Sequence, residues 1–186
     1  HTAQALGVIP MRALIVGGGR VGRELAQRLE ERGEEVLIVE RDEGAVEALR
    51  ADGFSVHEGD GTKRDVMEKA GASNAKVVAA ATKDDETNLL VGQLARNTYD
   101  VDTVVARVNE PANLDAFEDL DIEAISTSLS VATSMDNVIE RPGISKWMTE
   151  LDQDGDVQEV EVTASVHVGK SISELDTKLP DDCHIA

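Results

Sequence analysis

The stretch Met11-Arg-Ala-Leu-Ile-Val-Gly-Gly-Gly-Arg-Val-Gly22 decides the fold of this chain. Its first six residues are mostly apolar and strand-like, and they run directly into three consecutive glycines. A helical pattern follows, with Val21, Leu25 and Leu29 at positions i, i+4 and i+8, and Gly33 is a stop signal. The stretch therefore predicts a strand, a tight glycine turn and a helix in direct succession.

The glycines Gly17, Gly19 and Gly22 have the spacing G-x-G-x-x-G. In a strand-to-helix turn the first glycine permits the sharp change of direction, the second lets the backbone approach a pyrophosphate, and the third lets helix and strand pack closely. A pyrophosphate would lie on the unpaired N–H groups and positive dipole end of the helix. Arg20, inside the loop, is placed either to lie over that pyrophosphate or to remain solvated at the helix start.

An acidic residue at a suitable distance supports a dinucleotide site. A second apolar strand, Glu35–Val39, ends at Glu40, which lies 23 positions after Gly17. An acid about 20 residues beyond the glycines holds ribose hydroxyls in dinucleotide-binding folds, so Glu40 is either this ribose ligand or a charge that caps the strand end. Its charge would repel a 2′-phosphate, which favours NAD or an adenine nucleotide over NADP, although the neighbouring Arg41 could accommodate that phosphate.

Strand patterns and helical patterns alternate from Met11 to Ser126. This alternation predicts a parallel sheet with right-handed crossovers, the doubly wound, Rossmann-like α/β class. In the long helix that starts near Asp84, we expect the inward stripe to be Leu89, Leu90, Gln93 and Leu94. We expect six strands, at 11–16, 35–40, 54–57, 76–81, 103–108 and 122–126, and further helices at 21–33, 43–51, 63–70 and 112–120.

The chain is strongly acidic, with 37 Asp and Glu against 18 Lys and Arg and a net charge of −19. Nucleic acids and anionic membrane surfaces are poor general partners, because Lys and Arg hold phosphate-rich polymers. The acid excess is spread through the chain, which suits a protein in very high salt, so we predict halophilic adaptation. There is no apolar run of about 18 residues, so we expect no direct membrane insertion. The single cysteine, Cys183, excludes an internal disulfide.

Further polar residues follow predicted strands, at the edge where a doubly wound sheet meets its ligand. Asp60 could accept a hydrogen bond from an adenine amino group, or it could be a turn residue, since Asp before Gly is common in turns. Lys83, within Thr82–Asp84, could contact phosphate or be solvated. Arg107 suits phosphate recognition, with pairing to Glu110 as the alternative.

Residues for hydride-transfer chemistry are missing. The only tyrosine, Tyr99, is followed four positions later by Thr103 and not by lysine, no histidine stands beside an acid–base partner at the sheet edge, and no Cys/His metal spacing occurs. Hydride transfer needs a proton donor and a substrate pocket. We therefore predict no catalytic residues and no metal site. A binding domain is the function that we favour, and an NAD-dependent oxidoreductase of the Rossmann class is the alternative.

Beyond Thr127 the alternation of strands and helices stops. Two apolar helical stripes, at 131–139 and 144–151, pack either on their own domain or on a partner, and we favour a partner because the only Trp and two of the four Met lie here. A period-two strand pattern then begins near Val160. We divide the chain into a linker at 1–10, a Rossmann-like domain at 11–140, a crossover helix and linker at 141–155, and the start of a small α+β domain at 156–186.

Several motifs, taken in order, resemble the RCK/KTN (TrkA-N type) family of nucleotide-binding regulatory domains. This family serves potassium channels, Trk/Ktr potassium-uptake systems and some cation/proton antiporters. The most specific motif is Asp84-Asp-Glu-Thr-Asn-Leu-Leu90. The other motifs are the glycine loop with its arginine, Val39-Glu-Arg-Asp42, Gly59-Asp-Gly-Thr62 and Ala106-Arg-Val-Asn109. The chain departs from the family pattern at Glu40, where Asp is frequent, at Gly61, where Ala is frequent, and at Lys83, where an acid is common.

The resemblance implies a ligand-operated conformational switch and no enzyme. The ligand would be NAD(H), ATP, ADP or AMP. The domain would form a homodimer or a larger ring through helices at 131–151, and its partner would be a membrane cation transporter or channel at the cytoplasmic face. By this match the cofactor-binding residues are Gly17, Gly19, Arg20, Val21, Gly22, Glu40, Arg41, Asp60, Gly61, Thr82, Lys83 and Arg107.

Overall fold

The computed structural model describes residues 10–140 of the chain. Most of the expected linker at 1–10, the second apolar stripe at 144–151, the crossover segment at 141–155 and the start of the α+β domain at 156–186 lie outside the described residues. Within 10–140, no helix is both long enough and apolar enough to cross a bilayer.

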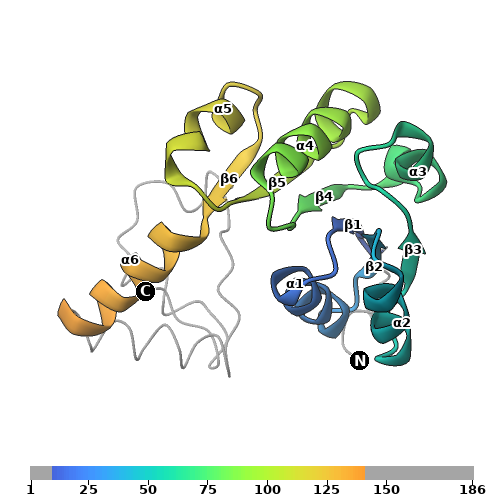
Figure 1. Ribbon diagram of the computed structural model, residues 1–186, viewed down its shortest axis with the longest axis horizontal. Coiled ribbons are helices and arrows are strands. Elements are labelled where there is room, and N and C mark those ends of the chain that lie inside the picture. Colours follow the sequence, from blue (N-terminus) through green and yellow to red (C-terminus); the bar gives the residue numbers. More distant parts are fainter. Residues whose placement is uncertain (1–9, 141–186) are drawn as a thin grey trace, which may run out of the picture. The chain divides into compact units, whose positions relative to one another are not determined.

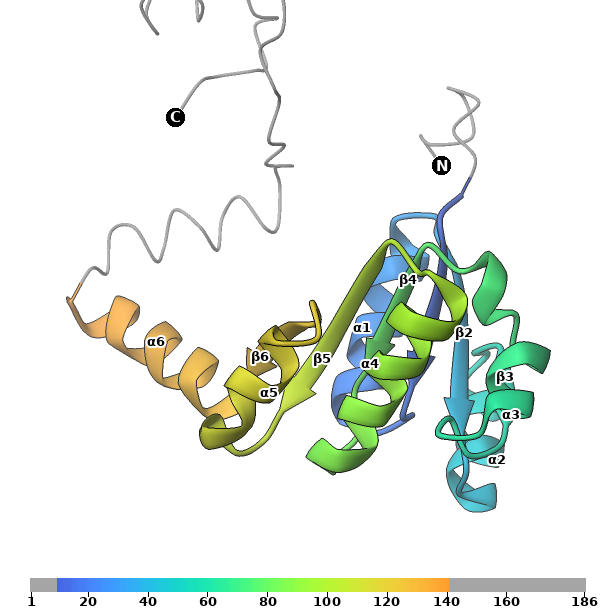
Figure 2. The same cartoon turned by 90° about the horizontal axis from the view of Figure 1, so that it is seen from above.

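The described residues form a six-stranded parallel sheet flanked by helices (Figure 1), which confirms the doubly wound, Rossmann-like class. The strand order is β3-β2-β1-β4-β5-β6, and the arrows of β2 and β5 point the same way in Figure 2. In chain order the elements are β1 (Arg12–Val16), α1 (Arg20–Glu31), β2 (Glu35–Glu40), α2 (Glu43–Ala51), β3 (Val56–Glu58), α3 (Arg64–Lys69), η2 (Ala72–Asn74), β4 (Val77–Ala80), α4 (Asp85–Tyr99), β5 (Thr103–Val108), η3 (Pro111–Asn113), α5 (Leu114–Glu118), β6 (Glu123–Ser126) and α6 (Thr127–Glu140).

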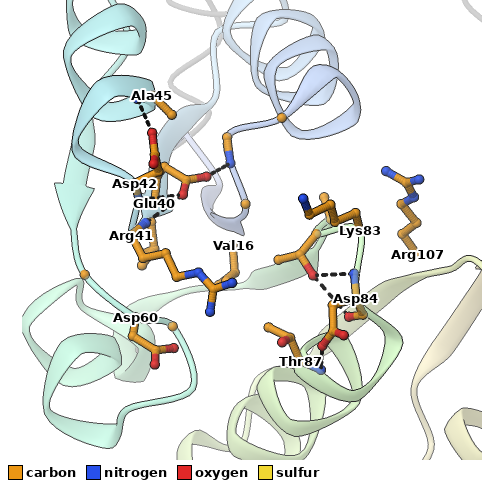
Figure 3. A pocket seen from close by; sticks show the side chains of 18 of the residues that line it. Val16, Glu40, Arg41, Asp42, Ala45, Asp60, Lys83, Asp84, Thr87 and Arg107 are labelled. Carbon is orange, nitrogen blue, oxygen red and sulfur yellow. Dashed lines mark hydrogen bonds between the residues drawn. The ribbon is translucent and has the colours of Figure 1, made fainter.

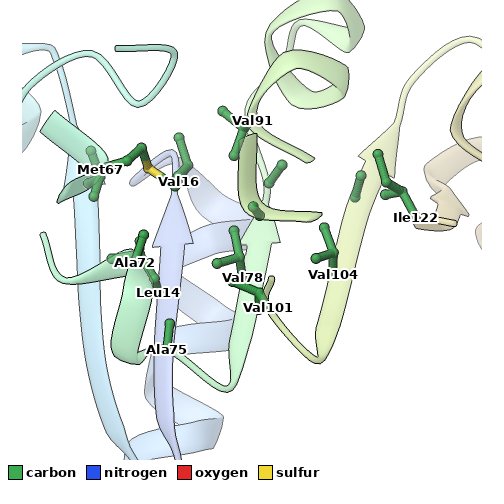
Figure 4. Close-up of a cluster of buried hydrophobic side chains, with 14 of the residues drawn as sticks. Leu14, Val16, Met67, Ala72, Ala75, Val78, Val91, Val101, Val104 and Ile122 are labelled. Atoms are coloured by element: carbon green, nitrogen blue, oxygen red, sulfur yellow. The ribbon is translucent and has the colours of Figure 1, made fainter. Parts of the chain in front are cut away.

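The central strand β1 shows how both faces of the sheet are covered. Its side chains alternate, so Leu14 and Val16 join one buried cluster while Ala13 and Ile15 join the other. The first cluster (Figure 4) also contains side chains from α3, α4 and α5, and the second contains side chains from α1 and α2. Two helical layers therefore enclose the sheet and leave the carboxyl ends of its strands at one edge.

The strand expected at 54–57 lies slightly later in the chain, at Val56–Glu58. The backbone N–H of Phe54 donates to Leu49 O at the end of α2 (3.1 Å), so it closes the helix and does not join the sheet. Pairing with β2 begins at Val56, which lies opposite Ile38. The end of the preceding helix thus takes up residues that hydrophobicity alone assigned to the strand.

The buried face of α4 also differs from the expected stripe. Leu90 was expected to face inward, and this is wrong, because its side chain is 42% exposed. The buried residues of the helix are Asn88, Val91, Gly92 and Ala95. A Cβ at Gly92 would lie 2.5 Å from Cδ1 of Ile122. The helix approaches the sheet so closely that small residues occupy the contact, and the expected residues Leu89, Gln93 and Leu94 flank it, only partly buried.

A small residue also occupies a close contact at the start of α1, and Gly22→Ala should destabilise the protein there. A Cβ at Gly22 would lie 1.9 Å from the backbone oxygen of Gly17, so the turn or the helix must move. Overpacking of this kind costs about 1–3 kcal/mol, although alanine is the better helix former. Urea unfolding at fixed salt concentration measures the loss.

Gly44→Ala is the matched control, because Gly44 also lies in the first turn of a helix, α2. Its Cβ would meet only Asp42 Oδ1, at 3.4 Å. This substitution should stabilise the protein by about 0.4–1 kcal/mol, since it restricts the unfolded chain. Equal effects of the two substitutions would contradict the close approach at Gly22.

Candidate functional site

A cavity of about 680 Å³ lies at the carboxyl ends of β1, β2, β4 and β5 (Figure 3). The strand order reverses between β1 and β4, and an open parallel sheet holds its ligand at such a switch point. In Figure 3, Glu40 and Asp60 lie on one side of the cavity, and Lys83 and Arg107 lie on the other. The lining includes ten of the predicted cofactor-binding residues, namely Gly17, Gly19, Arg20, Glu40, Arg41, Asp60, Gly61, Thr82, Lys83 and Arg107.

Two predicted residues, Val21 and Gly22, do not line this cavity. Val21 is 42% exposed on α1. Gly22 is buried beneath the turn, and the contact with Gly17 described above is the close approach expected of the third glycine. A role for either residue in ligand binding stays a prediction.

The glycine turn brings bare backbone to the cavity. Gly17 has φ +103°, a left-handed conformation that side chains rarely adopt, and a Cβ there would lie 2.9 Å from Thr82 Cγ2. Gly19 begins α1 as its N-cap, and a Cβ there would meet nothing within 4 Å. The turn is therefore tight at its first glycine and open toward the cavity at its third position.

The N-terminus of α1 lacks the cap that the neighbouring helices have. Asp42 caps α2 by accepting from Ala45 N (2.9 Å), and Asp84 caps α4 by accepting from Thr87 N (2.7 Å). In α1 the cap residue is a glycine, and no acid lies in the first turn. Uncapped N–H groups and the helix dipole form a site for an anion.

Glu40 links the glycine turn to the loop after β2. Its Oε2 accepts from Gly18 N (2.7 Å), and its Oε1 accepts from the N–H groups of Arg41 (2.8 Å) and Asp42 (2.9 Å). Each carboxylate oxygen can accept about two hydrogen bonds, so Oε2 keeps one free position toward the cavity. The carboxylate therefore holds the loop, as the strand-capping alternative requires, and can still accept a ligand hydroxyl.

Four cationic side chains surround the cavity: Arg20, Arg41, Lys83 and Arg107. Within the described part of the chain, none of the four forms a side-chain hydrogen bond or an ion pair, and the expected alternative pairing of Arg107 with Glu110 does not occur. Nε of Arg107 is buried and has no hydrogen-bond partner among residues 10–140. An unpaired buried guanidinium nitrogen is costly, because it has lost its hydrogen bonds to water without gaining one in the protein.

Asp60 lies across the cavity on the loop after β3. Its Oδ1 accepts from the hydroxyl (2.7 Å) and the N–H (2.9 Å) of Thr62, which is the turn contact named above as an alternative. The hydrogen bond from the Thr62 hydroxyl is the main cause that holds the pKa of Asp60 below its ordinary value. Asp60 is thus ionised near neutral pH, and its Oδ2 bonds to none of the described residues.

Asn88 is a residue whose role sequence reasoning missed. It lies on α4, is fully buried, and hydrogen-bonds the loop after β4 and the end of β5. Val91, Gly92 and Ala95 follow Asn88 at i+3, i+4 and i+7, so all four residues lie on the same face of α4. A polar residue in line with small buried residues is the sequence signal that could have indicated a buried Asn88.

Asp85 has an equally dense set of contacts. Its carboxylate accepts from the backbone N–H groups of Asn109 (2.8 Å) and Glu110 (3.0 Å) and from the side-chain amides of Asn109 (2.7 Å) and Asn113 (2.9 Å). Burial alone would raise the pKa of Asp85, but these hydrogen bonds outweigh it and lower the pKa to about 2. In the sequence, Asp85 stood out only as a member of the motif Asp84–Leu90. Among residues 10–140, no group of His, Cys, Asp and Glu could hold a metal ion.

Fold and cavity together define a Rossmann-like domain with an open cavity at the switch point of its sheet. The chain belongs to the TrkA-N domain family, which matches residues 13–128. A Trk system potassium uptake protein TrkA homolog from Methanothermobacter thermautotrophicus is 34% identical over 168 residues, which cover 89% of this chain and 77% of the relative.

Two solved structures have the same fold. The GsuK channel bound to NAD superposes with a TM-score of 0.64 at 24% identity and covers 77% of this chain and 26% of that chain. The AMP-bound form of the Kef CTD from Shewanella denitrificans has a TM-score of 0.60 at 20% identity and covers 76% of this chain and 91% of that chain. At this level of identity the two likenesses concern the fold alone.

Asp85→Asn should make the stability of the domain less dependent on acid pH. Because the folded pKa lies below the ordinary value, the contribution of Asp85 is fully present above about pH 4 and is lost as pH falls through 2. The shift corresponds to about 2 kcal/mol. Urea unfolding of both proteins from pH 5 to pH 2 should show their difference shrinking by this amount. A difference that is independent of pH would contradict the role of these four hydrogen bonds.

Proposed function

We propose that this chain is a nucleotide-sensing regulatory domain that binds NAD(H) or an adenine nucleotide (ATP, ADP or AMP) and controls potassium or other monovalent cation transport. The observation that carries the proposal is the set of four cationic side chains that line the cavity and form no ion pair with any of residues 10–140, in a chain whose net charge is −19. The uncapped start of α1 opens on the same cavity. A cavity that gathers cations in so acidic a protein suits an anionic ligand.

The two walls of the cavity suggest how a nucleotide would lie. Phosphates would lie on the start of α1 with Arg20 and Arg107 alongside, and a ribose hydroxyl would donate to the free position of Glu40 Oε2. The adenine amino group would donate to Asp60 on the loop after β3. A 2′-phosphate would meet the negative charge of Glu40, so NAD should bind better than NADP.

Regulation and not catalysis is the role that family membership supports. The Methanothermobacter relative is a Trk system potassium uptake protein homolog, and the GsuK channel and the Kef CTD share the fold. A ligand can shift such a domain only through its differential affinity for two conformations. The domain would act on a membrane cation transporter or channel from the cytoplasmic face.

Glu40→Gln should weaken NAD binding. Glutamine keeps the size of the side chain but removes the charge, and hydrogen bonds to charged groups are worth about 1.5–3 kcal/mol, which is roughly a 10- to 100-fold rise in Kd. Isothermal titration calorimetry of the full chain with NAD, ATP, ADP, AMP and NADP, at high potassium chloride concentration, measures both the affinity and the ligand preference.

Glu47→Gln is the control, because Glu47 is exposed on α2 and does not line the cavity. It should leave Kd unchanged. If none of the nucleotides binds the unmodified chain, the proposed function is wrong. If nucleotides bind and Glu40→Gln has no effect, Glu40 is not a ribose ligand.

A homodimer formed through α6 is the second part of the proposal. The side chains of Val131, Met135, Val138 and Ile139 are 57–75% exposed and lie at i, i+4, i+7 and i+8, so they form one apolar stripe. A second copy of this stripe would cover it, because self-association buries the same patch on both subunits.

Met135→Asp should therefore convert a dimer into a monomer in sedimentation velocity experiments. A charge in the centre of an apolar interface is left unpaired and buried, which disfavours association. Thr133→Asp is the matched control, since Thr133 lies on the opposite side of the same exposed helix. A monomeric unmodified chain, or a dimer that survives Met135→Asp, would contradict this interface.

A further inference from the structure

The first turn of α4 carries two polar side chains, Asp85 and Asn88, that stand outside the cavity but bond to segments that line it or adjoin it. They lie three residues apart, so they share one face of the helix. Neither residue touches the space that a nucleotide would occupy. Their contacts join two loops that are far apart in sequence, after β4 and after β5.

Asn88 uses its whole hydrogen-bonding capacity on the loop after β4 and the end of β5. Its Oδ1 accepts from Thr82 N (3.0 Å) and Thr82 Oγ1 (2.7 Å), and its Nδ2 donates to Thr82 O (3.0 Å) and Arg107 O (2.8 Å). A side-chain amide has two donors and two acceptor positions, and all four are filled. Because the residue is fully buried, a movement of either partner would leave a polar group without a bond.

The same two partners, Thr82 and Arg107, both line the cavity. Their backbones are therefore fixed to one another through a single buried side chain. Asp85 extends this link along the chain, since it binds Asn109, Glu110 and Asn113 directly after β5. The first turn of α4 thus holds the end of β5 and the beginning of η3 as one unit.

This unit leads to the start of α6. Val108, next to Arg107, pairs with Ser126 of β6, and α6 begins at the following residue, Thr127. The Thr127 hydroxyl also contacts Val108 O at 3.5 Å. A displacement of Arg107 on ligand binding would therefore be transmitted to α6 through Val108 and its contacts with Ser126 and Thr127.

We infer that Asn88 and Asp85 are positioning residues that couple occupancy of the cavity to β5, β6 and the start of α6. This inference rests on the proposed nucleotide-binding function. A ligand that pulls on Arg107 or Thr82 displaces the Asn88 amide, and because the amide has no spare partner, the two loops move together with the helix turn. Chains of hydrogen-bonded and packed side chains of this kind can carry energetic coupling between two sites.

A residue at the opposite end of α4 provides a control, because it stabilises the fold without contacting the segments that line the cavity. Arg96 also ties α4 to the sheet by side-chain bonds to backbone oxygens, namely Val101 O (3.0 Å), Asp102 O (3.1 Å) and Asp121 O (2.6 and 3.0 Å). It lies at the end of the strands away from the cavity and does not line it. Arg96→Met removes these bonds and retains most of the side-chain stem.

The test is hydrogen exchange measured by mass spectrometry on the full chain, with and without a saturating nucleotide, taken as the first of NAD, ATP, ADP and AMP that binds. In the unmodified chain, nucleotide should slow exchange locally, in peptides covering 17–23, and remotely, in peptides covering 109–118 and 123–130, which contain no residue that lines the cavity. Asn88→Ala and Asp85→Asn should keep the local protection and lose at least half of the remote protection. Asn88→Ala should also raise Kd by about two- to tenfold, the worth of one hydrogen bond.

Arg96→Met should lower the melting temperature and keep both kinds of protection. The inference is overturned if Asn88→Ala and Asp85→Asn keep full remote protection, or if Arg96→Met loses it to the same extent. Should Asn88→Ala fail to fold, Asp85→Asn alone decides, because it preserves side-chain size. If the unmodified chain binds no nucleotide, the proposed function fails and this inference with it, whereas binding with unaltered remote protection in the variants overturns the inference alone.

Discussion

The hydrogen bond from Gly18 N to the Glu40 carboxylate is the contact on which the site depends. It joins the turn after β1 to the loop after β2, and the same carboxylate holds two more N–H groups of that loop. Gly18 must remain bare for this contact, because a Cβ there would lie 2.3 Å from Leu49 Cδ1. The start of α1 is consequently held open beside the cavity, without a side chain of its own to cap it. An incoming anion therefore finds donors already in position and pays little to order them.

Charge gives this geometry its selectivity. The chain carries an excess of acids, and acids occur around the cavity too, as Glu40, Asp42, Asp60 and Asp84. Asp42 and Asp84 are engaged as helix caps and Asp60 by Thr62, whereas the cations Arg20, Arg41, Lys83 and Arg107 have no ion-pair partner in the described part of the chain. The two caps are thus committed to the protein, Glu40 and Asp60 each keep at least one acceptor position, and the positive groups remain for a ligand. Arg107 contributes in two ways, since its residue lines the cavity and its backbone oxygen accepts a hydrogen bond from the buried Asn88.

The parallel direction of the strands and the ligand edge at their carboxyl ends followed from the alternation of strand and helix patterns together with the positions of Gly17 and Glu40, because connection rules leave few topologies open. The strand order itself comes from the structure. The inward faces of the helices did not follow from the sequence pattern either. Hydrophobicity favoured Leu90 for the core, yet tight packing against Ile122 places Gly92 and Ala95 at the contact, and only the distance between helix and sheet decides this. Asn88 and Asp85 were missed for a related reason: their partners lie in loops whose spatial meeting no local pattern reports. The helix at 144–151 and the α+β start at 156–186 stay predictions.

The two outermost strands of the sheet have a consequence for solubility. β3 has three residues and β6 has four, and both carry an exposed glutamate, Glu58 and Glu123. Short, charged edges offer few unpaired backbone groups to another chain, so strand addition and fibre-like stacking are disfavoured. Within residues 10–140, contact between copies through the edges of the sheet is therefore less favourable than contact through the exposed apolar stripe of α6.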